Sequence, residues 1–171
     1  EAWYSFTSYT HPTEIHRTSV KTGKGERWYQ VRVPVQTERF AVDQEFAVSK
    51  DGTRIPLFIM RSKEWVRDGK APAILTGYGG FQVSLSPAFS SNMFPWLERG
   101  GVYVVANLRG GSEYGESWHR GGMLRNKQNT FDDFIAVAEH LIRTGVTSAD
   151  RLVIRGGSNG GLLVGAAMTQ R

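Results

Sequence analysis

The residues best suited to chemistry lie in a glycine-rich run at positions 155–161, where Gly156, Ser158 and Gly160 form the pattern G-x-S-x-G. The run joins an apolar segment of strand length to an apolar segment of helix length, which is the context of a nucleophile elbow. A serine on such a sharp turn occupies a strained backbone position, so the residues two before and two after it must lack bulk. The pattern predicts Ser158 as a nucleophile and the backbone N–H of Asn159 as an oxyanion donor. The alternative is a glycine-rich turn without chemistry, because short motifs also arise by chance.

A second glycine-rich segment, residues 76–81, directly follows an apolar run that predicts a buried strand. In the fold that uses a nucleophile elbow, the loop after an early strand supplies the other half of the oxyanion hole. Tyr78, which lies between Gly77 and Gly79, is a candidate for that donor through its phenol. An exposed turn in which Tyr78 only packs explains the same residues, and both interpretations stay open at this point.

A third loop, residues 107–115, follows another apolar run. Loops at the carboxyl end of parallel strands surround the ligand site in α/β folds, so this loop is a candidate neighbour of the site. The simpler explanation of its polar residues is an ion pair between Arg109 and Glu113, or a capped turn.

None of the four histidines follows Ser158 in the sequence, although this fold places its acid and its histidine after the nucleophile. His11 and His16 fall in an N-terminal β-segment. His119 is expected in a loop that is not directed at the serine, and His140 on the solvated face of a helix. A serine needs an adjacent base to act as a nucleophile, so this chain by itself is expected to be inactive.

The N-terminal part shows the period of β-strands. Residues 3–9, 15–20 and 28–35 predict three strands separated by turn residues. They form a small antiparallel meander that is too short to be a domain by itself.

A different pattern follows. Residues 46–49 and 54–60 are rich in strand-forming residues, and the Asp-Gly in the intervening residues 50–53 predicts a tight hairpin with positive φ angles. Residues 73–76 and 102–106 are continuous apolar runs, which is typical of buried parallel strands.

Helical patterns alternate with these strands. Residues 92–99 predict one helix, and residues 130–143 predict the clearest helix of the chain. Thr130 and Asp133 form an N-terminal capping pattern there, and Gly145 can end the helix. With the strand and helix that flank the elbow, the alternation predicts an α/β domain with a mostly parallel sheet.

Composition excludes several classes of protein. The 171 residues are 40% hydrophobic and 22% charged, which is ordinary for a globular protein. The net charge of +5 comes from scattered Lys and Arg rather than from a basic run, so no nucleic-acid partner is expected. The absence of cysteine excludes disulfides, a thiolate nucleophile and Cys-based zinc sites. We expect no metal or organic cofactor and no membrane partner, and a soluble protein of the cytoplasm or periplasm.

The glycine-rich loops and the segments between them resemble the prolyl oligopeptidase family in order and spacing, from about residue 40 to residue 171. The resemblance is carried by Tyr-Gly-Gly-Phe at 78–81, Asn-Leu-Arg-Gly-Gly at 107–111, Tyr-Gly-Glu at 114–116, Trp-His at 118–119, Asn-Lys-Gln-Asn at 126–129, Phe-Asp-Asp-Phe at 131–134 and Gly-Gly-Ser-Asn-Gly-Gly at 156–161. The resemblance implies that residues 1–36 are the last blade segment of a β-propeller. It implies that residues 37–171 are the N-terminal part of an α/β-hydrolase catalytic domain, truncated after the helix of the nucleophile elbow.

The same resemblance implies a serine peptidase whose propeller admits only short peptides and which cleaves them after proline. Carried over to this chain, Ser158 matches the nucleophile, and Asn159 matches the backbone oxyanion donor with its side chain near the substrate. Tyr78 matches the tyrosine that completes the oxyanion hole, and Phe81 matches an apolar wall near the proline pocket. The related oligopeptidase that cleaves after basic residues typically carries alanine at the position of Asn159. The triad Asp and His would lie beyond Arg171.

The sequence therefore predicts acyl transfer from a short peptide to Ser158, followed by hydrolysis. The expected partners are short peptide substrates and a missing C-terminal part of its own catalytic domain. Two alternatives remain: another serine hydrolase, such as an esterase, an acyltransferase or the basic-residue-specific oligopeptidase, or an inactive binding module on a hydrolase fold.

Overall fold

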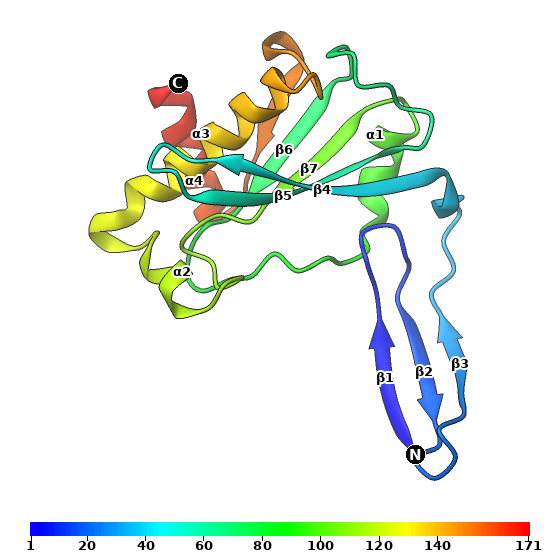
Figure 1. Ribbon diagram of the computed structural model, residues 1–171. Helices are drawn as coiled ribbons and strands as arrows, with labels where there is room; N and C mark the ends of the chain where they lie inside the picture. Colours follow the sequence, from blue (N-terminus) through cyan, green and yellow to red (C-terminus); the bar gives the residue numbers. More distant parts are fainter.

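The computed structural model describes all residues, 1–171, as two β-sheets, the larger of which is flanked by helices (Figure 1). The smaller sheet contains β1 (Ala2–Phe6), β2 (Glu14–Thr18) and β3 (Gly25–Gln30). The larger sheet contains β4 (Phe40–Val48), β5 (Arg54–Ser62), β6 (Ala73–Gly77), β7 (Val102–Ala106) and β8 (Leu152–Arg155). The helices are α1 (Phe94–Leu97), α2 (Glu116–Arg120), α3 (Lys127–Arg143) and α4 (Asn159–Gln170).

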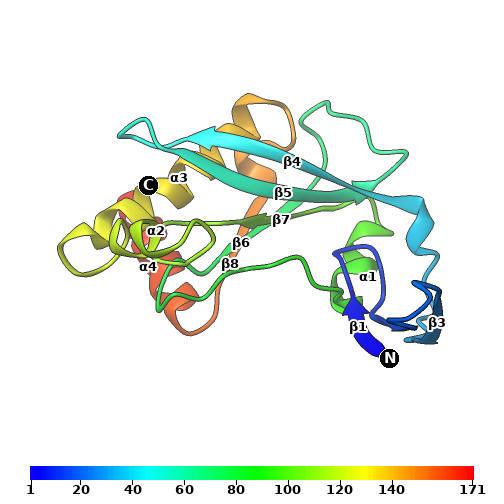
Figure 2. The ribbon, with the colours of Figure 1, turned by 60° about the horizontal axis from the view of Figure 1, so that its bottom comes forward.

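The smaller sheet is the antiparallel meander that the alternating pattern predicts, in the order β1-β2-β3. Its third strand differs in position, because β3 begins at Gly25 and ends at Gln30 instead of running over residues 28–35. Nearly all residues of β1 and β3 are exposed, and Trp3 and Trp28 meet edge to face on its surface. The sheet projects from the rest of the molecule beside α1 (Figures 1 and 2). It therefore has almost no core of its own.

The larger sheet has the strand order β4-β5-β7-β6-β8. β6 pairs in parallel with β7 and with β8, whereas β4–β5 and β5–β7 are antiparallel. The sheet is thus mixed, and the prediction of a mostly parallel sheet holds for only one side of it. The hairpin at residues 50–53 accounts for the antiparallel β4–β5 pair, because strands joined by a short turn must run in opposite directions.

The hairpin itself is confirmed, but its turn has only one left-handed residue. Gly52 has a φ of +86°, and its N–H donates to the carbonyl of Ser49 over 2.9 Å. A single left-handed glycine after a turn is the pattern of a three-residue hairpin loop rather than the two-residue loop that needs two positive φ angles.

Alternate side chains of the central strand β7 enter two separate cores. Val104 belongs to a cluster of 17 buried residues that also contains Phe134 of α3 and Leu163 of α4. Val105 belongs to a second cluster of 7 buried residues that contains Phe94 of α1. The period-2 alternation of a strand therefore buries both faces of the sheet.

The segment after β1 attaches the smaller sheet to this second core. Tyr9 is 7% exposed, and its ring centroid lies 5.4 Å from that of Phe58. Beside it, the hydroxyl of Thr7 accepts a hydrogen bond from the backbone N–H of Phe89 over 3.2 Å.

The sequence predicted the last residue of α3 better than its first residue. α3 ends as predicted, since Gly145 has a φ of +73° and the N–H of Val146 returns to the carbonyl of Leu141 over 2.9 Å. The helix begins three residues before Thr130, however, so the predicted capping pattern is wrong. The predicted helix at 92–99 is reduced to α1 and a preceding 3₁₀ turn. None of the helices combines the length and apolar character needed to span a bilayer.

Candidate active site

Ser158 lies on the sharp turn between β8 and α4. It has a φ of 55°, which is a strained conformation for a residue with a side chain, and it is exposed. The turn is so tight that a Cβ on Gly156 would lie 2.0 Å from the carbonyl oxygen of Gly160. Position 156 therefore accepts only glycine. These are the features expected of a nucleophile elbow.

The Tyr78 loop packs directly against this turn. The side-chain amide of Asn159 donates to the carbonyl oxygen of Tyr78 over 2.5 Å. Gly80 passes so close that a Cβ there would lie 2.5 Å from Asn159 Nδ2, and a Cβ on Gly160 would face the Tyr78 ring. The structure thus brings together three of the residues singled out in the sequence: Ser158, Asn159 and Tyr78.

A hollow of about 390 Å³ opens beside the turn. Tyr78, Gly156 and Gly157 line it together with Tyr9 and Arg155. Burial raises the pKa of the Tyr9 phenol, and its hydroxyl has no hydrogen-bond partner. The sequence did not predict Tyr9 as a neighbour of the site. Residues 3–9 alternate like a single strand, and this pattern does not show that the chain turns at Tyr9 toward the larger sheet.

Phe81 lies apart from this hollow. Its ring is 77% exposed, and both Phe81 and Gln82 have positive φ angles of 53° and 58°. Two consecutive non-glycine residues in the left-handed region are uncommon, so the loop holds Phe81 outward at a cost in backbone strain. Its role as an apolar wall near a proline pocket remains a prediction.

The loop after β7 buries its arginine. Arg109 is 7% exposed and binds Asp133 through Nη2–Oδ1 (2.6 Å) and Nε–Oδ2 (2.9 Å), and Asp51 through Nη1–Oδ2 (2.5 Å). The expected Arg109–Glu113 pair is therefore wrong, since Glu113 accepts instead from the backbone N–H of Leu85 over 3.0 Å.

Electrostatics keep this guanidinium charged. Burial alone opposes the charge, but the bonds to Asp133 and Asp51 outweigh it and raise the pKa of Arg109. The same arginine holds the pKa of Asp51 well below its ordinary value. Because the carboxylates of Asp51 and Asp133 both pair with Arg109, this guanidinium stabilises the fold and is not available to bind a ligand.

Thr130 and Asp133 serve this network instead of capping α3. Thr130 is fully buried, and its hydroxyl donates to the carbonyl of Arg109 over 2.8 Å. The Oδ2 atom of Asp133 accepts from the backbone N–H of Arg109 over 3.2 Å. One turn of α3 therefore holds both the backbone and the side chain of the β7 loop.

Neither His119 nor His140 forms a hydrogen bond with Ser158. His119 lies in α2 rather than in a loop, and its Nδ1 is 2.8 Å from the carbonyl oxygen of Gly110. His140 is half-buried, and its Nε2 lies 2.8 Å from Oε2 of Glu45, so its predicted solvated position is wrong. Glu45 draws it inward from the neighbouring strand β4.

No three His, Cys, Asp or Glu side chains gather closely enough to hold a metal ion.

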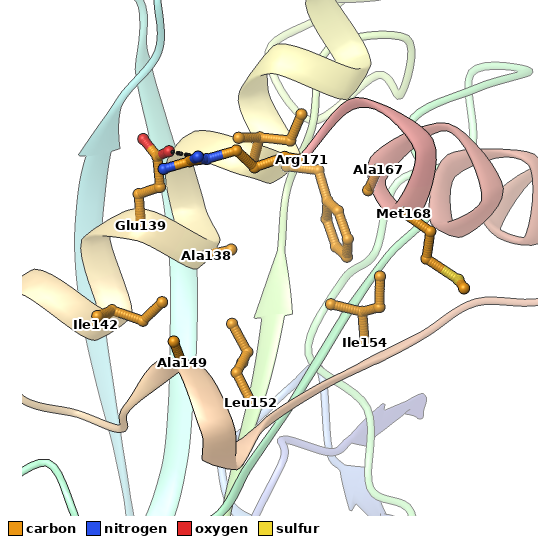
Figure 3. A pocket seen from close by; sticks show the side chains of 11 residues that line it. Ala138, Glu139, Ile142, Ala149, Leu152, Ile154, Ala167, Met168 and Arg171 are labelled. Carbon is orange, nitrogen blue, oxygen red and sulfur yellow. Dashed lines mark hydrogen bonds and ion pairs between the residues drawn. The ribbon is translucent and has the colours of Figure 1, made fainter.

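An apolar groove of about 460 Å³ lies elsewhere, between α3, α4 and β8 (Figure 3). Ile142, Leu152 and Met168 surround it, while Arg171 and Glu139 form an ion pair of 2.9 Å at its rim. β8 pairs only with β6, so the groove lies beside an open sheet edge. The groove contains no nucleophile, and it is an uncovered face rather than a site for chemistry.

A serine at positive φ between a parallel strand and a helix, with a second glycine-rich loop against it, is the arrangement that serine hydrolases use. Comparisons with known proteins agree with this class. The sequence matches the prolyl oligopeptidase family over residues 87–171. It is 48% identical over 171 residues to a prolyl endopeptidase of Elizabethkingia miricola, and this alignment spans all of the chain but 24% of that relative.

Solved structures show the same likeness. A prolyl endopeptidase structure has a TM-score of 0.96 and 57% identity, covering 99% of this chain and 25% of that one. A post-proline cleaving enzyme from Rickettsia typhi has a TM-score of 0.91 and 41% identity, covering 98% of this chain and 24% of that one. The chain thus spans about a quarter of the length of these relatives. It belongs to the prolyl oligopeptidase family of serine peptidases.

Proposed function

We propose that this chain is the nucleophile-bearing part of a peptidase that cleaves short peptides after proline through an acyl-enzyme on Ser158. The observation that carries the proposal is the position of Ser158, which is exposed at a φ of 55° on a turn that packs against the Tyr78 loop. The relatives named as prolyl endopeptidases support both the reaction and the residue preference.

In this mechanism the hydroxyl of Ser158 attacks the carbonyl carbon of the residue before the scissile bond, and its proton passes to a histidine. The negative charge that develops on the carbonyl oxygen is stabilised by the backbone N–H of Asn159 and the phenol of Tyr78. The histidine then protonates the leaving amine, and water hydrolyses the ester on Ser158. The histidine and its aspartate come from a part of the protein other than these residues.

The proposed domain arrangement follows from the surfaces that the structure leaves uncovered. Residues 37–171 would form the first part of an α/β-hydrolase domain, with its remainder covering the apolar groove and the open edge of β8. Residues 1–36 would form the last blade segment of a β-propeller. The exposed aromatic rings of Trp3, Tyr4 and Trp28 support this, because a sheet with two apolar exposed faces needs neighbours. The greater length of the relatives supports both assignments.

The preference for proline over basic residues has a second support in this chain. The Tyr78 loop, residues 76–83, and the elbow, residues 155–161, contain no Asp or Glu. A lysine or arginine side chain next to Ser158 would therefore find no carboxylate on these two loops to pair with its charge.

The test uses the full-length protein with two fluorogenic peptides that differ only in carrying proline or arginine before the scissile bond. Faster release from the proline peptide supports the proposal, and faster release from the arginine peptide overturns the preference. A fluorophosphonate probe should label the wild-type protein but not Ser158→Ala. Equal labelling of both proteins would assign the nucleophile to another residue.

A further inference from the structure

Two successive carbonyl groups of the Tyr78 loop are held by side chains from two different helices. The carbonyl of Tyr78 accepts from Asn159, the first residue of α4. The carbonyl of Gly79 accepts from the ammonium group of Lys127, the first residue of α3, over 2.6 Å. The loop is thus clamped on both sides of the Cα of Gly79.

Lys127 lies where a lysine is electrostatically unfavourable. The first turn of a helix carries a partial positive charge that disfavours cations, and the first turn of α3 contains no acidic residue. Lys127 is half-buried, burial lowers its pKa, and it takes part in none of the ion pairs of the structure. Its other close neighbour is the ring of Phe131, whose centroid lies 5.7 Å from Nζ. The hydrogen bond to Gly79 is therefore the main polar interaction that compensates for this placement.

The same face of α3 also fixes the conformation of Gly79. Thr130 follows Lys127 by three residues, which places both side chains on one side of the helix. A Cβ on Gly79 would lie 2.2 Å from Cγ2 of Thr130, and Gly79 has a φ of +63°. Lys127 thus binds the carbonyl of a residue whose Cα is already pressed against α3, so its ammonium group determines the orientation of that peptide.

We propose that Lys127 is a positioning residue for the oxyanion hole, which fixes the Gly79 peptide and thereby the Tyr78 phenol relative to Ser158. The inference rests on the proposed function, since it assigns Lys127 a part in the reaction on Ser158. Lys127 contacts no reacting atom and acts only through the loop.

The experiment compares Lys127→Met, Lys127→Arg, Tyr78→Phe and the double variant Lys127→Met/Tyr78→Phe in the full-length protein, on the proline peptide. Lys127→Met should lower kcat about 10-fold, with KM changed by less than about 2-fold, because displacing a donor costs less than deleting it. Lys127→Arg should keep most of the rate, since it retains a cationic donor. Lys63→Met is the matched control, because Lys63 is exposed and its side chain makes no hydrogen bond or ion pair, and it should leave kcat unchanged.

The double variant decides between positioning and a general structural role. If Lys127 acts through Tyr78, removing Lys127 should have almost no further effect once the phenol is gone, and the two losses will not add. Additive losses, a rise in KM without a fall in kcat, or a melting temperature lowered by more than about 10 °C with kcat retained would overturn the inference. An active wild type with an equally active Lys127→Met overturns the inference alone. A wild type without any hydrolysis of the proline peptide overturns the proposed function and this inference together.

Discussion

The elbow after β8 and the loop after β7 are both glycine-rich and polar, yet the structure treats them in opposite ways. The elbow exposes Ser158 in a strained conformation. The β7 loop instead buries Arg109 between Asp133 and Asp51. Glycine and polar residues at the end of a strand therefore do not distinguish a reactive group from a structural one. Burial and the number of partners do, and substitutions in the two loops should separate activity from stability.

The largest expected effect belongs to the elbow. Ser158→Ala in the full-length protein should lower turnover about a million-fold, because the proposed mechanism then lacks its nucleophile. Its free energy of unfolding should change by less than about 0.5 kcal/mol, since an exposed hydroxyl contributes little. Turnover and thermal unfolding on one preparation measure both, and residual activity above a few per cent would remove Ser158 from its role.

The β7 loop should show the reverse behaviour. Asp133→Ala leaves Arg109 buried without its main partner, and breaking a buried pair costs about 3–5 kcal/mol of stability. The matched control is Asp132→Ala, which removes a carboxylate bonded only to Gln128, and it should cost less than about 0.5 kcal/mol. Chemical unfolding of the two variants is the measurement. Equal losses would mean that the Arg109 network does not stabilise the fold.

A donor to the oxyanion should affect the rate alone. In the proposed mechanism the phenol donates to charge that develops only in the transition state, so Tyr78→Phe should lower kcat about 10²–10³-fold. KM and the melting temperature should stay close to wild type. An unchanged kcat would restore the interpretation of Tyr78 as a packing residue.

The smallest expected effect is at the exposed end of the network. The pKa of Asp51 is lower in the folded protein than in the unfolded chain. Its contribution to the free energy of unfolding is therefore fully present above the ordinary pKa near 4 and is lost as pH falls through the lowered value. Asp51 is half-exposed, so solvent screening limits this contribution to about 1 kcal/mol or less. The melting temperatures of wild type and Asp51→Asn should therefore converge as pH falls below about 4. A difference that does not vary with pH would show that the carboxylate charge is not involved.

Local patterns predicted the features that depend on neighbouring residues. The hairpin at Gly52, the end of α3 at Gly145 and the strand and helix around Ser158 each depend on a few consecutive residues. The sequence failed where partners come from distant segments. Proximity in sequence suggests an Arg109–Glu113 pair or a capped turn, while the partners of Arg109 in the structure are Asp51 and Asp133.

The same limit explains the other corrections. Thr130 and Asp133 match a capping pattern by spacing alone, but both are buried toward the β7 loop, which a helix pattern cannot show. The helix pattern puts His140 opposite the apolar stripe and hence in solvent, whereas Glu45 reaches it from β4. The contact of Lys127 with Gly79 had no signal in the sequence, because nothing local relates the start of α3 to the end of β6.

The attachment of the N-terminal sheet through Tyr9 has a consequence for folding kinetics. The partners of Tyr9 come from β5, α1 and β7, all of which are synthesised after it. Contacts between residues far apart in sequence form slowly, because the entropy of closing a long loop must be overcome before the contact stabilises anything. The core around Tyr9 is therefore complete only after β7 has been made. The β4–β5 hairpin pairs residues close together in sequence, so it can form before the meander is attached to the second core.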